Sequence, residues 1–313
     1  MRVFAGVDIG GTATKVGVMG AELKSTVFAT PQSERELIDG ITEAVLLLSG
    51  GAIIGGVGIG CPGAVTPDGK VKYMPNLHIE NFDVANLLSK KLSTVVAVTN
   101  DANAAALGEC RQSGLTNAVM LTLGTGVGSG IVIDGRIYEG YAGEAAELGH
   151  MIIEAGGRKC GCGMKGCLEA YASASALIES TKDAMKANKD SEMWRLCPDI
   201  SDVTGKLAFD GERLGDRAAS EVVARYVKYL AIGIVNICNI FRPQAVIIGG
   251  GVSNQGENLL SRLRAELDKC DYGYKFAPRP QILRASLGEY AGLYGAIAMI
   301  KNKVEENIIN ERP

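Results

Sequence analysis

The feature that most constrains the fold is a repeated pattern of a strand, a glycine turn and a second strand. The pattern first appears at residues 3–19 and returns at residues 118–133. A weak internal repeat of this kind predicts a duplicated α/β fold. The strands expected from it are Val3–Ile9, Thr14–Met19, Ala118–Leu123 and Ile131–Ile133.

The length of the chain points to two lobes. Its 313 residues are too many for one small core and suit two α/β lobes of about 100 to 200 residues each, with a cleft between them. Apolar residues make up 47% of the chain and charged residues 21%, which is typical of a compact globular protein. We expect a small lobe of residues 1–115, completed by a C-terminal helix at 291–313, and a large lobe of residues 116–290.

Charge and hydropathy narrow the possible partners. The formal net charge is -3 and no Lys/Arg-rich run is present, so we expect neither a nucleic-acid nor a membrane partner. No signal-peptide pattern opens the chain, and the apolar run Leu230–Phe241 is too short to span a bilayer and is interrupted by asparagines. We therefore expect a cytoplasmic protein with a small-molecule ligand, in which this run is a buried helix.

Further elements follow from periodicity and from turn residues. Helical patterns dominate residues 172–230. The other expected helices are Glu34–Ser49, Phe82–Leu92, Ala102–Arg111 and Ala291–Glu306, and the other expected strands are Ile53–Ile59, Val95–Val98 and Ala245–Ile248.

Three glycine turns at strand ends predict a nucleotide site. Backbone N–H groups of such turns can converge on phosphate oxygens, and a carboxylate beside them can hold Mg²⁺. The alternative for the first turn is an ordinary hairpin. Neither a dinucleotide fingerprint nor a P-loop is present, because a strand follows the second turn and no GxxxxGK[ST] stretch occurs. The candidate residues are Asp8, Gly10, Gly11, Thr12 and Lys15; Gly124, Thr125 and Gly126 in the turn at 124–130; and Gly249, Gly250 and Gly251.

Asp101 is the candidate catalytic base. Asn100 and Asp101 lie where a buried strand meets a helix, and in α/β sheets such positions face the ligand. Helix capping is the alternative role for this pair. Phosphoryl transfer requires positioned charge, Mg²⁺ and a group that accepts the proton of the substrate hydroxyl, which an aspartate can do.

His150, Cys160, Cys162 and Cys167 form the strongest motif in the chain. One nitrogen and three sulfurs match a closed tetrahedral zinc site, and the glycines between them allow a tight loop. Free cysteines in a glycine-rich loop are the alternative. With four protein ligands the metal has no open position, so we expect Zn²⁺ to order the loop and not to catalyse hydrolysis.

Two acidic residues flank this metal motif. Glu147 lies three positions before His150, and Glu169 lies two positions after Cys167. A metal that fixes the loop would also fix both carboxylates, which suits a ligand with many hydroxyls. Surface salt bridges are the alternative. His78 is the other histidine and is expected in a loop, so a Ser/His/Asp system is disfavoured.

Together these motifs resemble the ROK family (repressors, open reading frames and kinases), and most closely its bacterial glucokinases. The resemblance covers essentially the whole chain and is most specific across residues 147–169. It implies an actin-like, ribonuclease H-like duplicated fold and transfer of the γ-phosphate of ATP to the 6-hydroxyl of glucose. It assigns Asp101 as the base and the following residues as sugar contacts: Gly63, Asn76, Asn100, Asp101, Glu147, His150 and Glu169.

The resemblance leaves the substrate open. N-acetylmannosamine kinase, allokinase and fructokinase share these motif residues. Glu144-Ala145-Ala146 departs from the family, which usually has a small residue first and glycine last, and this puts the preferred hexose in doubt. A sugar-sensing repressor would need a helix-turn-helix before the first motif, and an actin-like motor ATPase would not use the acids around the metal motif. The family also implies a homodimer or tetramer.

Overall fold

The computed structural model describes residues 2–74, 77–269 and 278–310. The chain forms two compact units. Unit 1 contains residues 1–118, 130–146 and 286–313, and unit 2 contains residues 119–129 and 147–285. Residues 130–146 therefore group with unit 1, whereas the sequence placed them in the large lobe.

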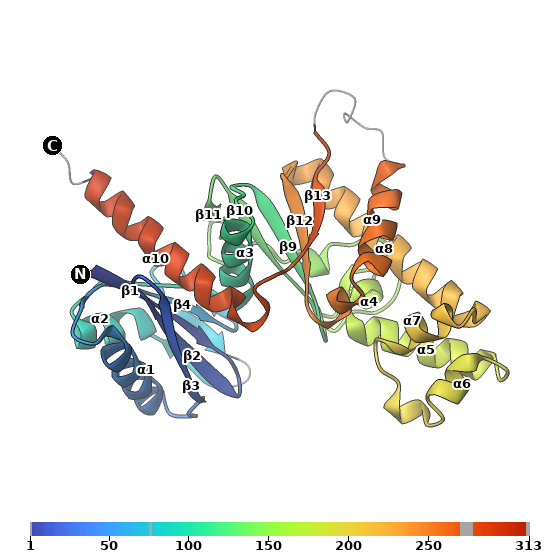
Figure 1. The fold of residues 1–313 in the computed structure, drawn as a ribbon, viewed down its shortest axis with the longest axis horizontal. Coiled ribbons are helices and arrows are strands. Elements are labelled where there is room, and N and C mark those ends of the chain that lie inside the picture. Colours follow the sequence, from blue (N-terminus) through green and yellow to red (C-terminus); the bar gives the residue numbers. More distant parts are fainter. Residues whose placement is uncertain (1, 75–76, 270–277, 311–313) are drawn as a thin grey trace. The chain divides into compact units, whose positions relative to one another are not determined.

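Unit 1 is built on a five-stranded sheet of order β3-β2-β1-β4-β8 (Figure 1). The first three strands form antiparallel pairs, whereas β1, β4 and β8 are parallel. The expected hairpin is present, and β3 is an additional strand that the sequence did not predict. The strands are β1 (Arg2–Ile9), β2 (Ala13–Met19), β3 (Leu23–Ala29), β4 (Ile53–Cys61) and β8 (Val96–Asn100).

Helices cover both faces of this sheet. Apolar side chains of α1 (Glu34–Ser49) and α2 (Val84–Leu92) pack with Val3, Ala5 and Val7 of β1. The intervening residue Gly6 faces the other way and lies against α10 (Ala291–Asn310). Side chains alternate between the two faces of a strand. Because Gly6 has no side chain, α10 can approach the second face of the sheet closely. Helix α3 (Asp101–Gln112) packs on α10.

A small sheet in unit 1 was not expected from the sequence. Strands β5 (Ala64–Val65), β6 (Val71–Met74) and β7 (Ile79–Phe82) have the order β5-β6-β7. The helix predicted to begin at Phe82 therefore begins at Val84, because Phe82 ends β7. Strands of two to four residues are too short to give a readable periodicity.

The second five-stranded sheet has the order β11-β10-β9-β12-β13. The predicted strand at 118–123 is confirmed, but the next strand begins at Val127, so the glycine turn covers residues 124–126 and not 124–130. The strands are β9 (Ala118–Leu123), β10 (Val127–Ile133), β11 (Arg136–Ile137), β12 (Ala245–Gly249) and β13 (Gln281–Arg284).

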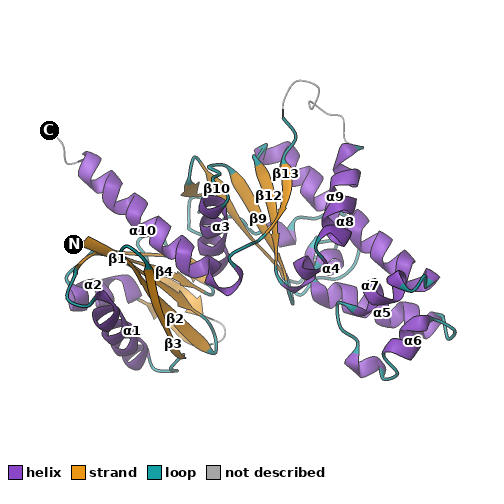
Figure 2. Cartoon of the chain, in the orientation of Figure 1, coloured by secondary structure: helices purple, strands orange, loops and turns teal. Residues whose placement is uncertain are grey.

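Helices make up most of the rest of unit 2 (Figure 2). One helix among the described residues, α8, is long and apolar enough to cross a membrane, but half of its most apolar window is buried in the protein. Such burial is typical of a core helix, as the sequence predicted. The helices are α4 (Glu169–Ala172), α5 (Ala174–Ala187), α6 (Glu192–Leu196), α7 (Leu207–Arg213), α8 (Arg217–Phe241) and α9 (Glu257–Asp268).

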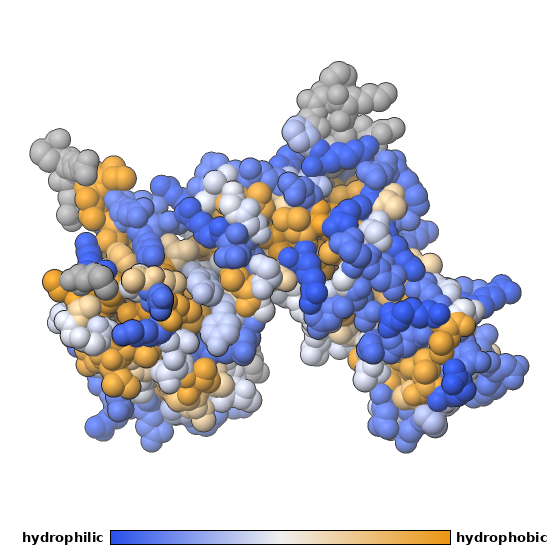
Figure 3. Space-filling view, in the orientation of Figure 1, coloured by the Kyte–Doolittle hydropathy of each residue, from blue (hydrophilic) through white to orange (hydrophobic). Residues whose placement is uncertain are grey.

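The last turns of α10 carry exposed apolar side chains. Ile308 and Ile309 are 43% and 64% exposed, and hydrophobic surface is visible over this end of the helix (Figure 3). Earlier in the same helix Leu293, Ala296 and Ile300 are buried. The buried side chains of α10 thus lie in its first four turns, as far as Val304, where it packs on the sheet.

Candidate functional site

Two carboxylates lie at one edge of the sheet in unit 1. Asp8 is near the end of β1 and pairs with Gly60 on β4, and Asp101 begins α3 directly after β8. Because β1, β4 and β8 are parallel, their carboxyl ends share an edge, where α/β sheets bind ligands. The structure therefore brings these two predicted site residues to the same edge.

Burial changes the acidity of both carboxyl groups. Asp101 is accessible to solvent, but protein atoms surround its carboxylate, and the resulting loss of hydration raises its pKa. A hydrogen bond from the Ala102 N–H, at 2.8 Å, acts in the opposite direction and lowers the pKa. Burial also raises the pKa of Asp8; Lys15 opposes this, and the charge of Asp101 adds to it. Neighbouring acids with raised pKa values are typical of catalytic sites.

Asn100 holds the start of α3. Its Oδ1 accepts hydrogen bonds from the N–H groups of Ala102 and Asn103 at 2.9 and 3.4 Å, and its Nδ2 donates to the Gly63 carbonyl at 3.2 Å. The capping alternative considered for this pair thus belongs mainly to Asn100. The Asp101 carboxylate itself stays accessible to solvent, as a general base requires.

The first glycine turn lies at the end of the β1–β2 hairpin. Gly10 donates to the Ala13 carbonyl at 2.9 Å, and a Cβ at Gly10 would lie 2.8 Å from the same oxygen. Thr12 is exposed. The ammonium of Lys15 lies 3.0 Å from the carbonyl oxygen and 3.3 Å from a carboxylate oxygen of Glu289. Lys15 therefore already has partners within unit 1.

Several residues near this edge had no local signal in the sequence. A Cβ at Gly292, in the first turn of α10, would lie 3.0 Å from Asp8 Cγ. The hydroxyl of Thr99, the residue before Asn100, donates to Glu139 at 2.6 Å. These contacts join segments 40 or more positions apart, and the sequence does not show which distant segments meet. The predicted sugar contact Asn76 lies outside the described residues.

In unit 2 the second and third glycine turns lie together. Gly250 has a left-handed backbone, with φ of 79°, and a Cβ there would lie 2.5 Å from the Leu123 carbonyl oxygen, next to Gly124. Only glycine adopts such a conformation at so close an approach without strain. Two of the three turns that were predicted to hold one nucleotide are therefore neighbours.

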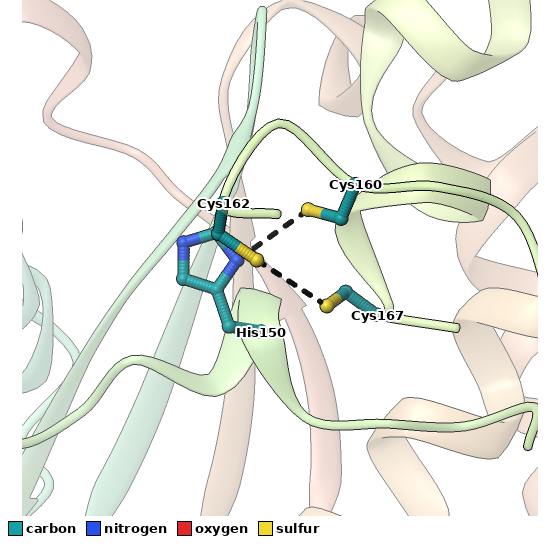
Figure 4. Close-up of side chains that lie close together, drawn as sticks. All are labelled: His150, Cys160, Cys162 and Cys167. Atoms are coloured by element: carbon teal, nitrogen blue, oxygen red, sulfur yellow. Dashed lines mark hydrogen bonds between the residues drawn. The ribbon is translucent and has the colours of Figure 1, made fainter. Parts of the chain in front are cut away.

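The four predicted metal ligands form one cluster (Figure 4). Their ligand atoms all lie within 4.8 Å of one another. The sulfurs of Cys162 and Cys167 are 3.7 Å apart, as are Cys160 Sγ and His150 Nδ1. A tetrahedron with metal–sulfur bonds of about 2.3 Å has edges of about 3.8 Å. The donor set and its spacing therefore fit Zn²⁺.

The cluster is partly shielded from water. Cys160 and Cys167 are buried, whereas Cys162 is exposed. Burial raises the pKa of Cys160 and of Cys167, and a backbone hydrogen bond from Met164 lowers the pKa of Cys162. Zinc is bound by thiolates, so metal binding at this cluster would release protons.

The two flanking acids differ in their surroundings. Glu147 is exposed and makes no hydrogen bond through its carboxylate to the described part of the chain. Glu169 is half-buried, and its Oε2 accepts the N–H of Val127 at 3.0 Å. Before Glu147, Ala146 has a left-handed backbone with φ of 71°, at the position where the family usually has glycine.

The model of the ROK family matches residues 4–303 of this chain. The chain belongs to the ROK family. A glucokinase of Thermotoga maritima is 37% identical to this ROK protein over 310 residues, which cover 96% of the chain and 97% of the relative.

Solved structures of the family show the same fold. A ROK glucokinase from Streptomyces griseus, in complex with glucose and AMPPNP, matches with a TM-score of 0.74 and 34% identity, covering 96% of this chain and 99% of that one. A ROK hexokinase from Thermus thermophilus matches with a TM-score of 0.79 and 31% identity, covering 97% and 99%. This ROK protein thus has the duplicated, actin-like α/β fold that the sequence predicted.

Proposed function

We propose that this protein is an ATP-dependent hexose kinase that transfers the γ-phosphate of ATP to the 6-hydroxyl of glucose. The observation that carries the proposal is Asp101, an accessible carboxylate with a raised pKa at the sheet edge that also holds Asp8. A glucokinase at 37% identity and a relative solved with glucose and AMPPNP support the same reaction.

Asp101 is the proposed base. It accepts the proton of the sugar hydroxyl while that oxygen forms a bond to the γ-phosphorus. The bond between the γ-phosphorus and the β,γ-bridging oxygen breaks, and ADP leaves. A raised pKa strengthens the carboxylate as a proton acceptor near neutral pH. Asn100 supports this role because it caps α3 and fixes the backbone that carries Asp101.

Phosphate contacts are proposed for the glycine turns. In unit 1 the backbone of Gly10, Gly11 and Thr12 would bind phosphate oxygens, and in unit 2 the turns at 124–126 and 249–251 would bind the nucleotide. Asp8 would hold Mg²⁺, which supplies charge neutralisation on the phosphates when bound. Lys15 would have to leave Glu289 to reach a phosphate, since its ammonium contacts that residue.

Sugar contacts are proposed for the metal loop, residues 150–167, and for the residues that flank it. His150, Cys160, Cys162 and Cys167 would hold Zn²⁺, which supplies loop order with no open coordination position. His150 Nδ1 lies in the cluster, so its Nε2 is left for a sugar hydroxyl. Glu147 and Glu169 would accept hydrogen bonds from further hydroxyls. Asn76, Asn100 and Gly63 complete the proposed sugar set, and we further expect a cytoplasmic homodimer or tetramer.

A hexose panel tests the proposal. Release of ADP from Mg-ATP would be measured with metal-loaded protein and glucose, mannose, N-acetylmannosamine, allose or fructose. We expect hexose-dependent release that is fastest with glucose. A different preferred hexose would keep the kinase and change its substrate. Sugar binding with no ADP release would instead indicate a sensor, and release that is independent of sugar would indicate an ATPase.

A further inference from the structure

Glu169 connects the metal loop to the second glycine turn. Its Oε2 accepts the N–H of Val127 at 3.0 Å, and a Cβ at Gly126 would lie 2.3 Å from the same oxygen. The carboxylate thus packs directly on the backbone at the end of the turn, where β10 begins. This use of Glu169 differs from the sugar contact that the resemblance to the family implies.

The other end of the carboxylate lies beside the metal cluster. Glu169 Oε1 is 3.4 Å from Cys160 Sγ, and Glu169 itself lies two residues after the ligand Cys167. A cysteine that binds a metal is a thiolate and cannot donate a hydrogen bond, so the contact with Cys160 exists for the thiol alone. The bond to Val127 does not involve a metal ligand and remains available when metal is bound.

The segments on both sides of the metal loop contact this turn or the first residues of β10. On one side, Leu148 donates its N–H to the Ser129 hydroxyl oxygen at 3.0 Å. On the other, Ala174 donates its N–H to the Gly124 carbonyl at 2.8 Å. A Cβ at Gly149 would lie 2.1 Å from the Val127 carbonyl oxygen, so this backbone also lies against the turn.

Two of the four metal ligands lie within these same two segments. His150 follows Leu148 and Gly149, and Cys167 comes shortly before Glu169. Strand-like contacts already join the segments, because Leu168 donates to the Met151 carbonyl at 2.9 Å. A metal bound by His150 and Cys167 would cross-link them and thereby fix the position of Glu169.

We propose that Glu169 is a positioning residue through which the metal loop orders the backbone of the turn at 124–126 and the start of β10, and so sets the affinity for the nucleotide. The ligand class, a Mg-nucleoside triphosphate, rests on the proposed function. Metal removal then weakens nucleotide binding as well as sugar binding. Glu147, which is exposed and makes no such bond, does not share this role.

Hydrogen exchange without any substrate tests this directly. The exchange of residues 124–130 would be compared in metal-loaded native protein, Glu169→Ala, Glu169→Gln and Glu147→Ala, with metal content measured for each. Loss of a charge-assisted hydrogen bond predicts exchange at Val127 about tenfold faster in Glu169→Ala. Glu169→Gln keeps an acceptor oxygen and should resemble the native protein, as should Glu147→Ala.

The second part of the test measures the same hydrogen exchange after a chelator has removed the metal. In native protein metal removal should speed exchange of residues 124–130, whereas in Glu169→Ala it should add little, because the connection is already lost. The affinity for AMPPNP, measured by calorimetry without sugar, should fall about tenfold in Glu169→Ala and should not change in Glu147→Ala.

The proposal is overturned if residues 124–130 exchange equally in metal-loaded Glu169→Ala and native protein. It is also overturned if metal removal speeds exchange equally in both. Gly126→Ala checks the same contact from the turn side, because its methyl group would displace Glu169 Oε2 and should also speed exchange. These readouts need no turnover, so they fail or succeed separately from the kinase assignment.

Discussion

The sheet edge of unit 1 and the metal loop of unit 2 hold functional side chains in different ways. At the sheet edge, Asp8 and Asp101 extend from the ends of regular elements that a buried core positions. In the loop, residues 151–168 contain no helix or strand of more than isolated bridges, and Gly163 and Gly166 have left-handed backbones. Secondary structure thus fixes the first group, whereas the second would depend on the proposed metal and its four ligands.

The two regions have different proposed roles. The proposed chemistry belongs to carboxylates at the sheet edge whose pKa values burial raises, and the proposed substrate contacts belong to a loop that a metal would order. Substitutions at the edge should therefore change the rate with little loss of structure, and changes at the metal should alter binding and stability together.

Asp101→Asn should have the largest effect. Loss of the base predicts a kcat about 10²- to 10⁴-fold lower, whereas the Kd values for glucose and AMPPNP should change little. Steady-state kinetics and calorimetry measure both quantities. Asp39→Asn, an exposed aspartate of α1, is the matched control and should behave as native. A Kd that rises as much as kcat falls would assign Asp101 to binding instead.

Metal removal should have the next largest effect. Metal at 100 times its Kd stabilises a protein by about 2.7 kcal/mol, so chelation should lower the Tm by several degrees and weaken glucose binding. Calorimetry with and without added Zn²⁺ measures this. Cys167→Ala should have the same effect as chelation. Cys110 is a buried cysteine of unit 1 outside the metal cluster, so the Cys110→Ala protein should still bind the metal. An unchanged metal content in Cys167→Ala would argue against the four-ligand site.

A methyl group between α10 and α3 should have a moderate effect on stability. A Cβ at Gly295 would lie 1.6 Å from the Ala104 carbonyl oxygen, so Gly295→Ala should destabilise unit 1 by about 1–3 kcal/mol. Denaturant unfolding measures the loss. Gly161→Ala in the metal loop is the comparison, since no atom lies within 4 Å of its Cβ position and the change should be below about 0.5 kcal/mol. Equal losses would contradict the difference in packing between these two positions.

The pH dependence should be the smallest effect. Because the folded state raises the pKa of Asp8, its contribution favours folding below the unfolded pKa and is lost as the pH rises through the folded value. Asp8→Asn should therefore match the native Tm at low pH and exceed it slightly at neutral pH. Thermal scans without nucleotide test this; a lower Tm for Asp8→Asn at neutral pH would show that the charge stabilises the edge.

Local patterns in the sequence predicted much of the fold. The helix at Glu34–Ser49 and the strand at Ala118–Leu123 have the bounds expected, because apolar periodicity and capping residues mark them. Strand β3 has no fully buried residue, and β5 to β7 are very short, so neither gives a clear pattern. The metal cluster was predicted because its ligands are close in sequence.

Long-range partners were not predictable in the same way. Lys15 meets Glu289 across 274 positions, and Glu169 meets Val127 across 42. Each contact depends on how distant segments pack, which residue types and spacing do not specify. The roles of the candidate site residues therefore stay predictions, and the sequence did not predict the contacts that position those residues.

The most direct test of the account is to follow the phosphate itself. Metal-loaded protein would be incubated with Mg-ATP and ¹³C-labelled glucose, and the products would be observed by ³¹P and ¹³C nuclear magnetic resonance. We expect one new phosphate ester, at the 6-carbon of glucose, formed in step with ADP. Inorganic phosphate with unchanged glucose, or no consumption of ATP while glucose is bound, would contradict it.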